Sequence, residues 1–213
     1  MGIIKSTINK ANRILSDRRS IRKYDETVKI SRSELESIIQ DAMTAPSSFN
    51  LQPWRFVVID TPEAKEKVKP YMMFNLQQLE TSSAIIAVYA DKKVAETADQ
   101  VLSQGVEKGL RTEEQKQQLK DMILSYISSY TPERLANSLM MDCGFVCIQL
   151  MLSAKACGYD TCPIGGYDRQ GFSDAVGMDT ERYMPALLIS IGKAAEDGKA
   201  STRYSVDAVT KWM

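Results

Sequence analysis

The sequence contains no histidine among its 213 residues. Without an imidazole group, Ser-His-Asp hydrolysis, Cys-His catalysis and histidine-ligated metal sites are all excluded. No stretch approaches the ~18 uninterrupted apolar residues of a transmembrane helix, so we predict no membrane span. The N-terminus lacks the apolar core of a signal peptide, which predicts a cytoplasmic protein. An enzyme built from this chain would have to rely on carboxylates, arginines or a cofactor.

The chain also lacks net charge, since 27 lysines and arginines balance 27 aspartates and glutamates. A neutral chain has no overall field to attract nucleic acid or an anionic membrane, so we expect neither as a partner. Basic residues are concentrated locally instead, in the cluster Arg18, Arg19, Arg22 and Lys23. The glycine-rich signatures of Rossmann and P-loop nucleotide sites are absent as well.

Only four cysteines are present, at positions 143, 147, 157 and 162. Cys143 and Cys147 share one face of an apolar helical stretch, and the later two could complete a Cys₄ zinc site. The spacings are not C-x₂-C, however, and the neighbouring residues are apolar. We therefore interpret all four as small, reduced core residues and assign no metal site.

One loop stands out between a helical pattern and a buried strand, in the run Ala45-Pro46-Ser47-Ser48-Phe49-Asn50-Leu51-Gln52-Pro53-Trp54. Its prolines restrict the backbone to few conformations. Its hydroxyl and amide side chains present alternating donors and acceptors, which suit a planar ligand rich in oxygen and nitrogen. The alternative interpretation is an ordinary polar connection in which Trp54 anchors the core.

Secondary structure follows from periodicity and capping signals. Helical patterns cover 3–16, 31–43, a segment after Thr61-Pro62, one or two stretches within 91–130, and 132–156. Apolar runs predict buried strands at 56–59, 84–89, 159–164 and 185–192. The helix over 132–156 is apolar almost all round, so it should be buried by its own core or by a partner subunit, with Gly158 as its C′ residue.

These elements predict one α+β domain over residues 1–213, with a central sheet flanked by helices and a long buried central helix. Residues from about 193 to 213 lose periodicity and form a C-terminal arm. A polar arm that ends in Trp212 needs a surface to lie against, and we expect a second subunit to provide it.

Three motifs, in order along the chain, resemble those of the nitroreductase family, the FMN-dependent NAD(P)H oxidoreductases. They are Arg18-Arg19-Ser20-Ile21-Arg22, the Pro46–Trp54 segment with its P-S-S-x-N-x-Q-P-W pattern, and Pro163-Ile164-Gly165-Gly166-Tyr167. The resemblance covers nearly the whole chain. It implies a nitroreductase-like sheet, bound FMN, transiently bound NAD(P)H, and a homodimer with FMN sites at its interface.

The basic motif is expected to hold the anionic end of the cofactor. By resemblance, Arg18, Arg19 and Ser20 contact the phosphate and ribityl groups, and Arg203 closes on the phosphate. Arg22 is expected at the N1/O2 edge of the ring, where a positive charge favours the reduced flavin. The planar fork of arginine suits phosphate. On residue types alone, a solvated basic turn is the alternative.

The loop motif is expected at the ring edge. By resemblance, Pro46, Ser47 and Ser48 contact the ring edge on one subunit. Asn50 and Gln52 match residues that approach the flavin from the partner subunit.

Two further positions are assigned by resemblance near the ring. Asn75 matches an amide at the ring edge. Gln78 stands where the family often has a lysine, so one positive charge is absent from the pyrimidine end of the ring.

The third motif brings backbone close to the cofactor. Glycines let backbone N–H groups reach a ligand directly, and by resemblance Pro163, Ile164, Gly165 and Gly166 hold flavin N5 and O4. A common variant of the family has glutamate where this chain has Gly165. No side chain is assigned as a catalytic residue. A lone Gly-Gly pair is otherwise a turn after a strand.

The resemblance implies hydride transfer from NADH or NADPH to a nitroaromatic, quinone or activated-alkene acceptor by a ping-pong mechanism. Three alternatives stay open at this point. The same scaffold could carry another flavin reaction, such as dehalogenation or flavin breakdown. Gly165 also leaves room for a flavin reservoir or redox module with little turnover. The third alternative is a helical dimerisation protein whose resemblance to the family is vestigial.

Overall fold

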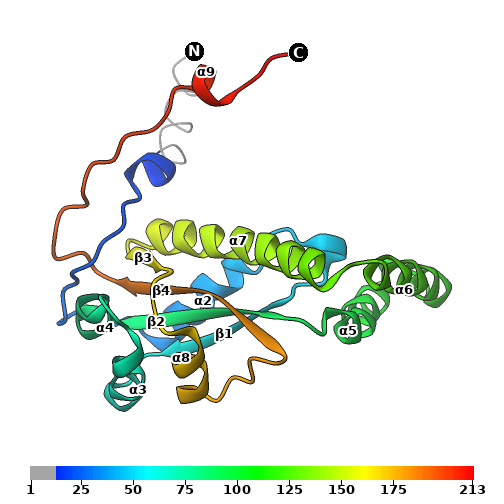
Figure 1. The fold of residues 1–213 in the computed structure, drawn as a ribbon, viewed down its shortest axis with the longest axis horizontal. Coiled ribbons are helices and arrows are strands. Elements are labelled where there is room, and N and C mark those ends of the chain that lie inside the picture. The colour runs from blue at the N-terminus through cyan, green and yellow to red at the C-terminus, as the bar shows by residue number, and fades with distance from the viewer. Residues whose placement is uncertain (1–12) are drawn as a thin grey trace.

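The computed structural model describes residues 13–213 (Figure 1). The helix expected over 3–16 therefore lies largely outside the described residues, although residues 13–17 are helical. The elements that follow are α2 (Arg32–Ala42), β1 (Trp54–Ile59), α3 (Pro62–Val68), α4 (Leu76–Thr81), β2 (Ala84–Asp91), α5 (Val94–Glu107), α6 (Glu113–Ser128), α7 (Pro132–Ala156), β3 (Asp160–Ile164), α8 (Arg169–Ala175), β4 (Tyr183–Gly192) and α9 (Val206–Val209).

The four strands form one antiparallel sheet in the order β1-β2-β4-β3. Successive side chains of a strand point to opposite faces, so a central strand covered on both faces must be apolar throughout. β2 meets this requirement, because all eight of its residues are buried. Ile86 and Val88 pack into the core on one face, and Ile85 and Tyr89 pack into the core on the other.

Helices cover both faces, which confirms the expected α+β architecture. The core on one face includes α2 and α7, and the core on the other face includes residues of α3, α4 and α8 (Figure 1). The capping box of α2 is present, since the Ser31 hydroxyl accepts from the Glu34 N–H and the Glu34 carboxylate accepts from the Ser31 N–H. Gly158 follows α7 with a φ of 84°, as expected for its C′ position.

Several details differ from the sequence-based expectations. Helices α4 and α8 were not predicted, because six or seven residues are too few to establish a helical period. Residues 206–209 form the short helix α9 within the predicted arm. Cys157 is exposed, so the expectation of a core position is wrong for this cysteine, while the other three are buried. No group of three or more metal-ligating side chains gathers within residues 13–213.

Helix α7 is long and apolar enough, by length and composition, to cross a membrane. Core helices of globular domains pass the same test, and Leu139, Val146 and Leu150 of α7 are buried in the core against the sheet. Within the single chain α7 is not buried on all sides, because its outer face leaves Met141 and Phe145 exposed. That outer face is the one expected to need a partner subunit.

The segment before α2 covers the free edge of β3. The Ile21 N–H donates to the Thr161 carbonyl at 3.1 Å, and the Asp25 N–H donates to the Lys193 carbonyl at 2.8 Å. These bonds place the 18–25 segment beside β3 and the start of the C-terminal arm. The arm then leaves the body of the molecule, and Trp212 near its end is 77% exposed (Figure 1).

A buried carboxylate anchors one end of β2. Asp91 receives two hydrogen bonds from Arg182, at 3.0 and 2.9 Å, and an ion pair with Arg55 at 3.2 Å. Burial alone would raise the pKa of Asp91, but the Arg182 hydrogen bonds, the Lys93 N–H and the Arg55 charge outweigh it. The pKa of Asp91 therefore lies below its usual range.

We expect Asp91→Asn to lower the free energy of unfolding by roughly 1.5–3 kcal/mol at pH 7, because charge-assisted hydrogen bonds to both arginines are lost. A depressed folded pKa contributes stability above the unfolded pKa of about 3.9, and that contribution disappears as pH falls through the folded pKa. As the pH falls below about 4, the stability of the variant should therefore decrease less than the stability of the wild type. Thermal or urea unfolding from pH 3 to 7 measures both effects.

Asp99→Asn is the matched control, because the Asp99 carboxylate is half exposed and bridges two partly exposed lysines of α6. Exposed ion pairs contribute little, so this variant should be much less destabilised than Asp91→Asn. Equal stability of the wild type and Asp91→Asn at pH 7 would contradict the role given to the Asp91 ion pairs.

Candidate functional site

Polar side chains from three segments meet at the outer edge of β3. Ser20 pairs with Thr161 in a parallel bridge, and Gln78 of α4 is buried nearby. The charges of Arg22 and Arg18 and the polar side chains of Gln78 and Ser20 favour the thiolate of Cys162 and so act to lower its pKa. Burial nevertheless dominates and raises the pKa of Cys162. We call the set Arg18, Ser20, Arg22, Asn75, Gln78, Cys162 and Gly166 the polar cluster.

Asn75 ties the turn after β3 to the start of α4. Its Nδ2 group donates to the Gly166 carbonyl at 2.7 Å and to the Met72 carbonyl at 3.1 Å. Its Oδ1 atom accepts from Gln78 Nε2 at 3.0 Å. Both N–H bonds of the Asn75 amide are thus directed at backbone, and a second lone pair on Oδ1 is what remains for a ligand.

The glycine turn is accessible. Gly165 and Gly166 are exposed, and a Cβ added at either one would meet no atom within 4 Å. Packing within the chain therefore does not require glycine here. The open surface above these residues leaves room for a flat ligand next to the backbone of the turn.

The arginines of the 18–22 segment differ in how they are used. Arg19 donates to the carbonyls of Ser16 and Arg18, so its guanidinium is turned toward its own backbone. Arg22 is exposed, and its backbone N–H donates to Glu196 at 2.7 Å. Arg18 Nη1 is buried and has no hydrogen-bond partner within residues 13–213. A buried guanidinium nitrogen without an anion is unfavourable, so an oxyanion would fit this position.

Arg203 is not brought to Arg18 by any contact in the described chain. Its guanidinium bonds Ser201 and Thr202 within the arm itself. The arm does pass closely over the basic segment, since a Cβ at Gly198 would lie 2.2 Å from Arg19 Cβ. Arg203 follows five residues later on an exposed stretch.

The loop with Pro46, Ser47, Ser48, Asn50 and Gln52 lies elsewhere. It leads directly into β1, which forms the edge of the sheet opposite to β3. Three strand spacings separate these two edges, roughly 14 Å. Within one chain the structure does not place the loop beside the polar cluster.

The loop itself is held by a small set of bonds. The Ser48 N–H donates to both carboxylate oxygens of Asp142 at 3.2 Å, and the Gln52 N–H donates to the Ser47 hydroxyl at 3.0 Å. Phe49 packs edge-on against Tyr126 of α6, with ring centroids 5.4 Å apart. Asp142 was not assigned from the sequence, although it is the one acidic residue of α7 after Glu133.

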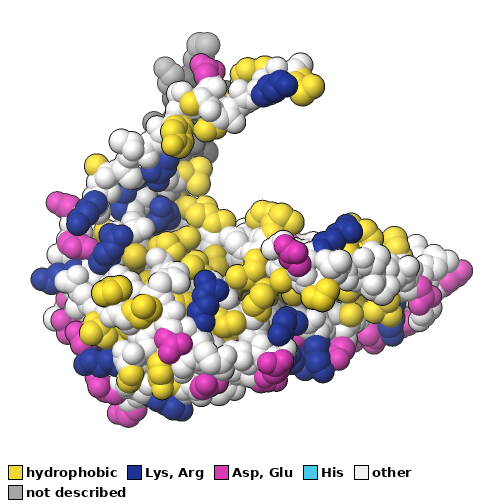
Figure 2. Space-filling model, viewed as in Figure 1, with side chains coloured by type: hydrophobic (Ala, Val, Ile, Leu, Met, Phe, Trp, Pro, Cys, Tyr) yellow, Lys and Arg dark blue, Asp and Glu magenta, His cyan; other side chains and the backbone are white. Residues whose placement is uncertain are grey.

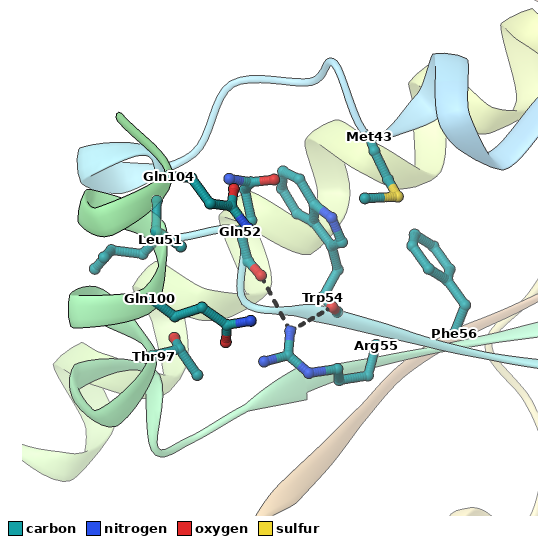
Figure 3. A pocket seen from close by; sticks show the side chains of 10 residues that line it. Met43, Leu51, Gln52, Trp54, Arg55, Phe56, Thr97, Gln100 and Gln104 are labelled. Atoms are coloured by element: carbon teal, nitrogen blue, oxygen red, sulfur yellow. Dashed lines mark hydrogen bonds between the residues drawn. The ribbon is translucent and has the colours of Figure 1, made fainter. Parts of the chain in front are cut away.

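A cleft of about 440 Å³ lies beyond this loop, between β1 and α5 (Figure 3). Its lining combines amides with apolar side chains, and its cation is Arg55. Arg55 donates to the carbonyls of Gln52 and Trp54 and is paired with Asp91. Because that charge is already neutralised, we do not assign the cleft to a phosphate-bearing ligand.

Comparison with known proteins gives one consistent answer. The model of the nitroreductase family matches residues 15–193. A Bacillus subtilis protein whose name describes an NAD(P)H nitroreductase, YdgI, is 46% identical over 199 residues, which cover 93% of this chain and 95% of that protein. The CLA biosynthesis enone reductase of Lactiplantibacillus plantarum is 38% identical over 201 residues, covering 94% and 93%.

A solved structure of similar sequence also matches. A protein from Exiguobacterium sibiricum, described as a nitroreductase in complex with FMN, has 43% identity and a TM-score of 0.92. The alignment covers 95% of this chain and 96% of that one.

Proposed function

The chain belongs to the nitroreductase family, and from that membership we propose that it is an FMN-dependent oxidoreductase. It uses NAD(P)H to reduce nitroaromatic, quinone or activated-alkene acceptors by a ping-pong mechanism. The FMN complex of the Exiguobacterium relative supports the cofactor. The enone reductase among the relatives supports an activated alkene as one class of acceptor.

The observation that carries this proposal is the unpartnered Arg18 guanidinium nitrogen in the polar cluster. A half-buried arginine with an unpartnered guanidinium nitrogen, on the same segment as the hydroxyl of Ser20, is a donor set that fits the phosphate and ribityl groups of FMN. Arg22, on the same segment, provides a second cation toward the ring. The accessible backbone at Gly165 and Gly166 fits the edge of a flat ring.

Bound FMN would supply the redox chemistry, accepting hydride from NAD(P)H and passing it to the acceptor. The chain's own residues bind and orient it. Gly165 and Gly166 would present backbone to the N5/O4 edge, and the lone pair on Asn75 Oδ1 would be available to a ring N–H group. Gln78 is neutral where the family often has lysine, so Arg22 is the cation that we assign to the N1/O2 edge. No side chain is needed as an acid or a base.

A complete site needs two copies of the chain. The polar cluster and the 46–52 loop lie at opposite edges of one sheet. In any one flavin site we therefore assign Pro46, Ser47, Ser48, Asn50 and Gln52 together to the partner of the copy that provides the polar cluster. Hydrophobic side chains gather on the concave side of the molecule, between the arm and α7, where a partner would lie (Figure 2).

The first prediction from this proposed function concerns cofactor identity. The purified protein should be yellow and release FMN on denaturation. Arg18→Met should weaken FMN binding by roughly 10- to 100-fold, the equivalent of losing a charged hydrogen bond, because the phosphate loses its buried partner. Riboflavin, which has no phosphate, should bind the variant and the wild type about equally. Fluorescence titration of the apoprotein with both flavins measures this.

Arg32→Met provides the control for Arg18→Met, because Arg32 is an exposed arginine of α2 paired with Glu36. Its FMN affinity should match the wild type. A colourless protein that cannot be reconstituted with FMN would contradict the proposed function as a whole.

A second prediction tests Arg22. If its charge lies at the N1/O2 edge, it stabilises the reduced flavin more than the oxidised flavin. One charge-assisted hydrogen bond is worth roughly 1.5–3 kcal/mol, and 30 mV corresponds to about 1.4 kcal/mol for a two-electron couple. Arg22→Ala should lower the midpoint potential of bound flavin by roughly 30–60 mV, measured by dye-coupled reduction. Arg18→Ala should leave the midpoint potential nearly unchanged. If Arg18→Ala lowered the potential and Arg22→Ala did not, Arg18 would be the residue at the N1/O2 edge and Arg22 would contact the phosphate.

A third prediction concerns assembly. Phe145→Glu places a charge on the exposed face of α7, where Phe145 is 40% exposed and Ile148 is 44% exposed. We expect the wild type to sediment as a dimer at sub-micromolar concentration, and the variant to dissociate and lose FMN together with its partner. Leu110→Glu, at an exposed apolar position in the turn between α5 and α6, should stay dimeric. A folded wild-type monomer with bound FMN would overturn the shared site.

A further inference from the structure

The 46–52 loop has an unusual backbone. Phe49, Asn50 and Gln52 adopt positive φ angles of 53°, 57° and 47°. Elsewhere in residues 13–213, one other non-glycine residue, Met73, does so. Side chains with a Cβ are disfavoured in this left-handed region, so three such residues in one loop persist only where surrounding contacts impose them.

Asp142 makes the contact that reaches this loop from α7. It is 3% exposed, and both of its carboxylate oxygens accept the Ser48 N–H at 3.2 Å, directly before Phe49. The Ser48 hydroxyl lies at 3.5 Å. The bond from the Gln52 N–H to the Ser47 hydroxyl closes the other end of the loop.

Folding stability does not explain why a carboxylate is buried at position 142. No lysine or arginine of residues 13–213 forms an ion pair with Asp142. Burial raises its pKa, and the Ser48 bonds offset that effect only in part. A buried carboxylate without a cation destabilises the folded state relative to an apolar side chain of similar size.

We propose that Asp142 is a positioning residue, which holds Ser47 through Gln52 in the strained conformation that contacts the flavin of the partner copy. The proposal rests on the proposed function, since it assumes that this loop contacts flavin. Asp142 acts through Ser48 and does not itself touch the cofactor. It also fixes Phe49 against Tyr126, so the same carboxylate sets the position of an aromatic side chain beside Ser48.

The test is Asp142→Leu, which keeps the branched shape of the Asp142 side chain, with methyl groups in place of the oxygens, and removes the acceptor. The flavin-free variant should melt at the wild-type temperature or above it, because a buried charge is gone. Its FMN affinity should fall at least tenfold, and amide hydrogen exchange at Ser48 and Gln52 should accelerate. Asp142→Asn keeps one carbonyl oxygen for the Ser48 N–H, so its FMN affinity should stay within threefold of the wild type.

Ser138→Ala is the matched control, because Ser138 lies one turn earlier on α7 and lines the same small cavity as Asp142. It should retain the wild-type melting temperature, affinity and exchange rates. If Asp142→Leu lost melting temperature in step with affinity, Asp142 would be an ordinary structural residue and the proposal would be overturned.

The two proposals fail in different ways. Wild-type protein that binds no FMN would overturn the proposed function. Wild-type protein that binds FMN, with an Asp142→Leu variant that binds it equally tightly and exchanges its loop amides at the same rate, would overturn the role of Asp142 alone.

Discussion

The strand order β1-β2-β4-β3 is the constraint on which the rest of the structure depends. It separates the 46–52 loop, at the β1 edge, from the basic segment 18–25, which pairs with β3 at the other edge. In the site that we propose, the flavin contacts both regions, so it would lie where two chains meet. Two other features are consistent with a partner subunit. The exposed apolar residues of α7 and the extended C-terminal arm both present surface that a single chain leaves uncovered.

Local signals in the sequence predicted the elements well. Helix α7 begins and ends where the sequence indicates, because Thr131 and Pro132 specify its start and Gly158 specifies its end. β2 was recognisable as an uninterrupted apolar run. The fold class and the family followed from such features together with the three motifs.

The strand order and part of the site could not be predicted, because they depend on contacts between residues far apart in the sequence. Nothing near Asp142 in the sequence indicates that its carboxylate binds Ser48, 94 residues earlier. The positive φ angles of Phe49 and Gln52 are equally hidden, since neither residue type favours them. The hydrogen bond from Asn75 to the Gly166 carbonyl depends on the position of α4 beside the turn after β3. Helix α4 is too short to show a helical period in the sequence.

The distribution of charge in the polar cluster links cofactor binding to assembly. Gln78 donates a hydrogen bond to Asn75, and Asn75 donates one to the Gly166 carbonyl. This part of the cluster is therefore neutral, and most of its hydrogen bonds are made without a ligand. The anion-binding capacity that we propose lies in the 18–22 segment, which is held by the pairing of Ile21 with Thr161 and is overlaid by the arm at Gly198. An arm fixed by a partner subunit would therefore also fix the arginines beneath it. Cofactor binding and dimerisation should then strengthen each other, since each orders a segment that the other requires.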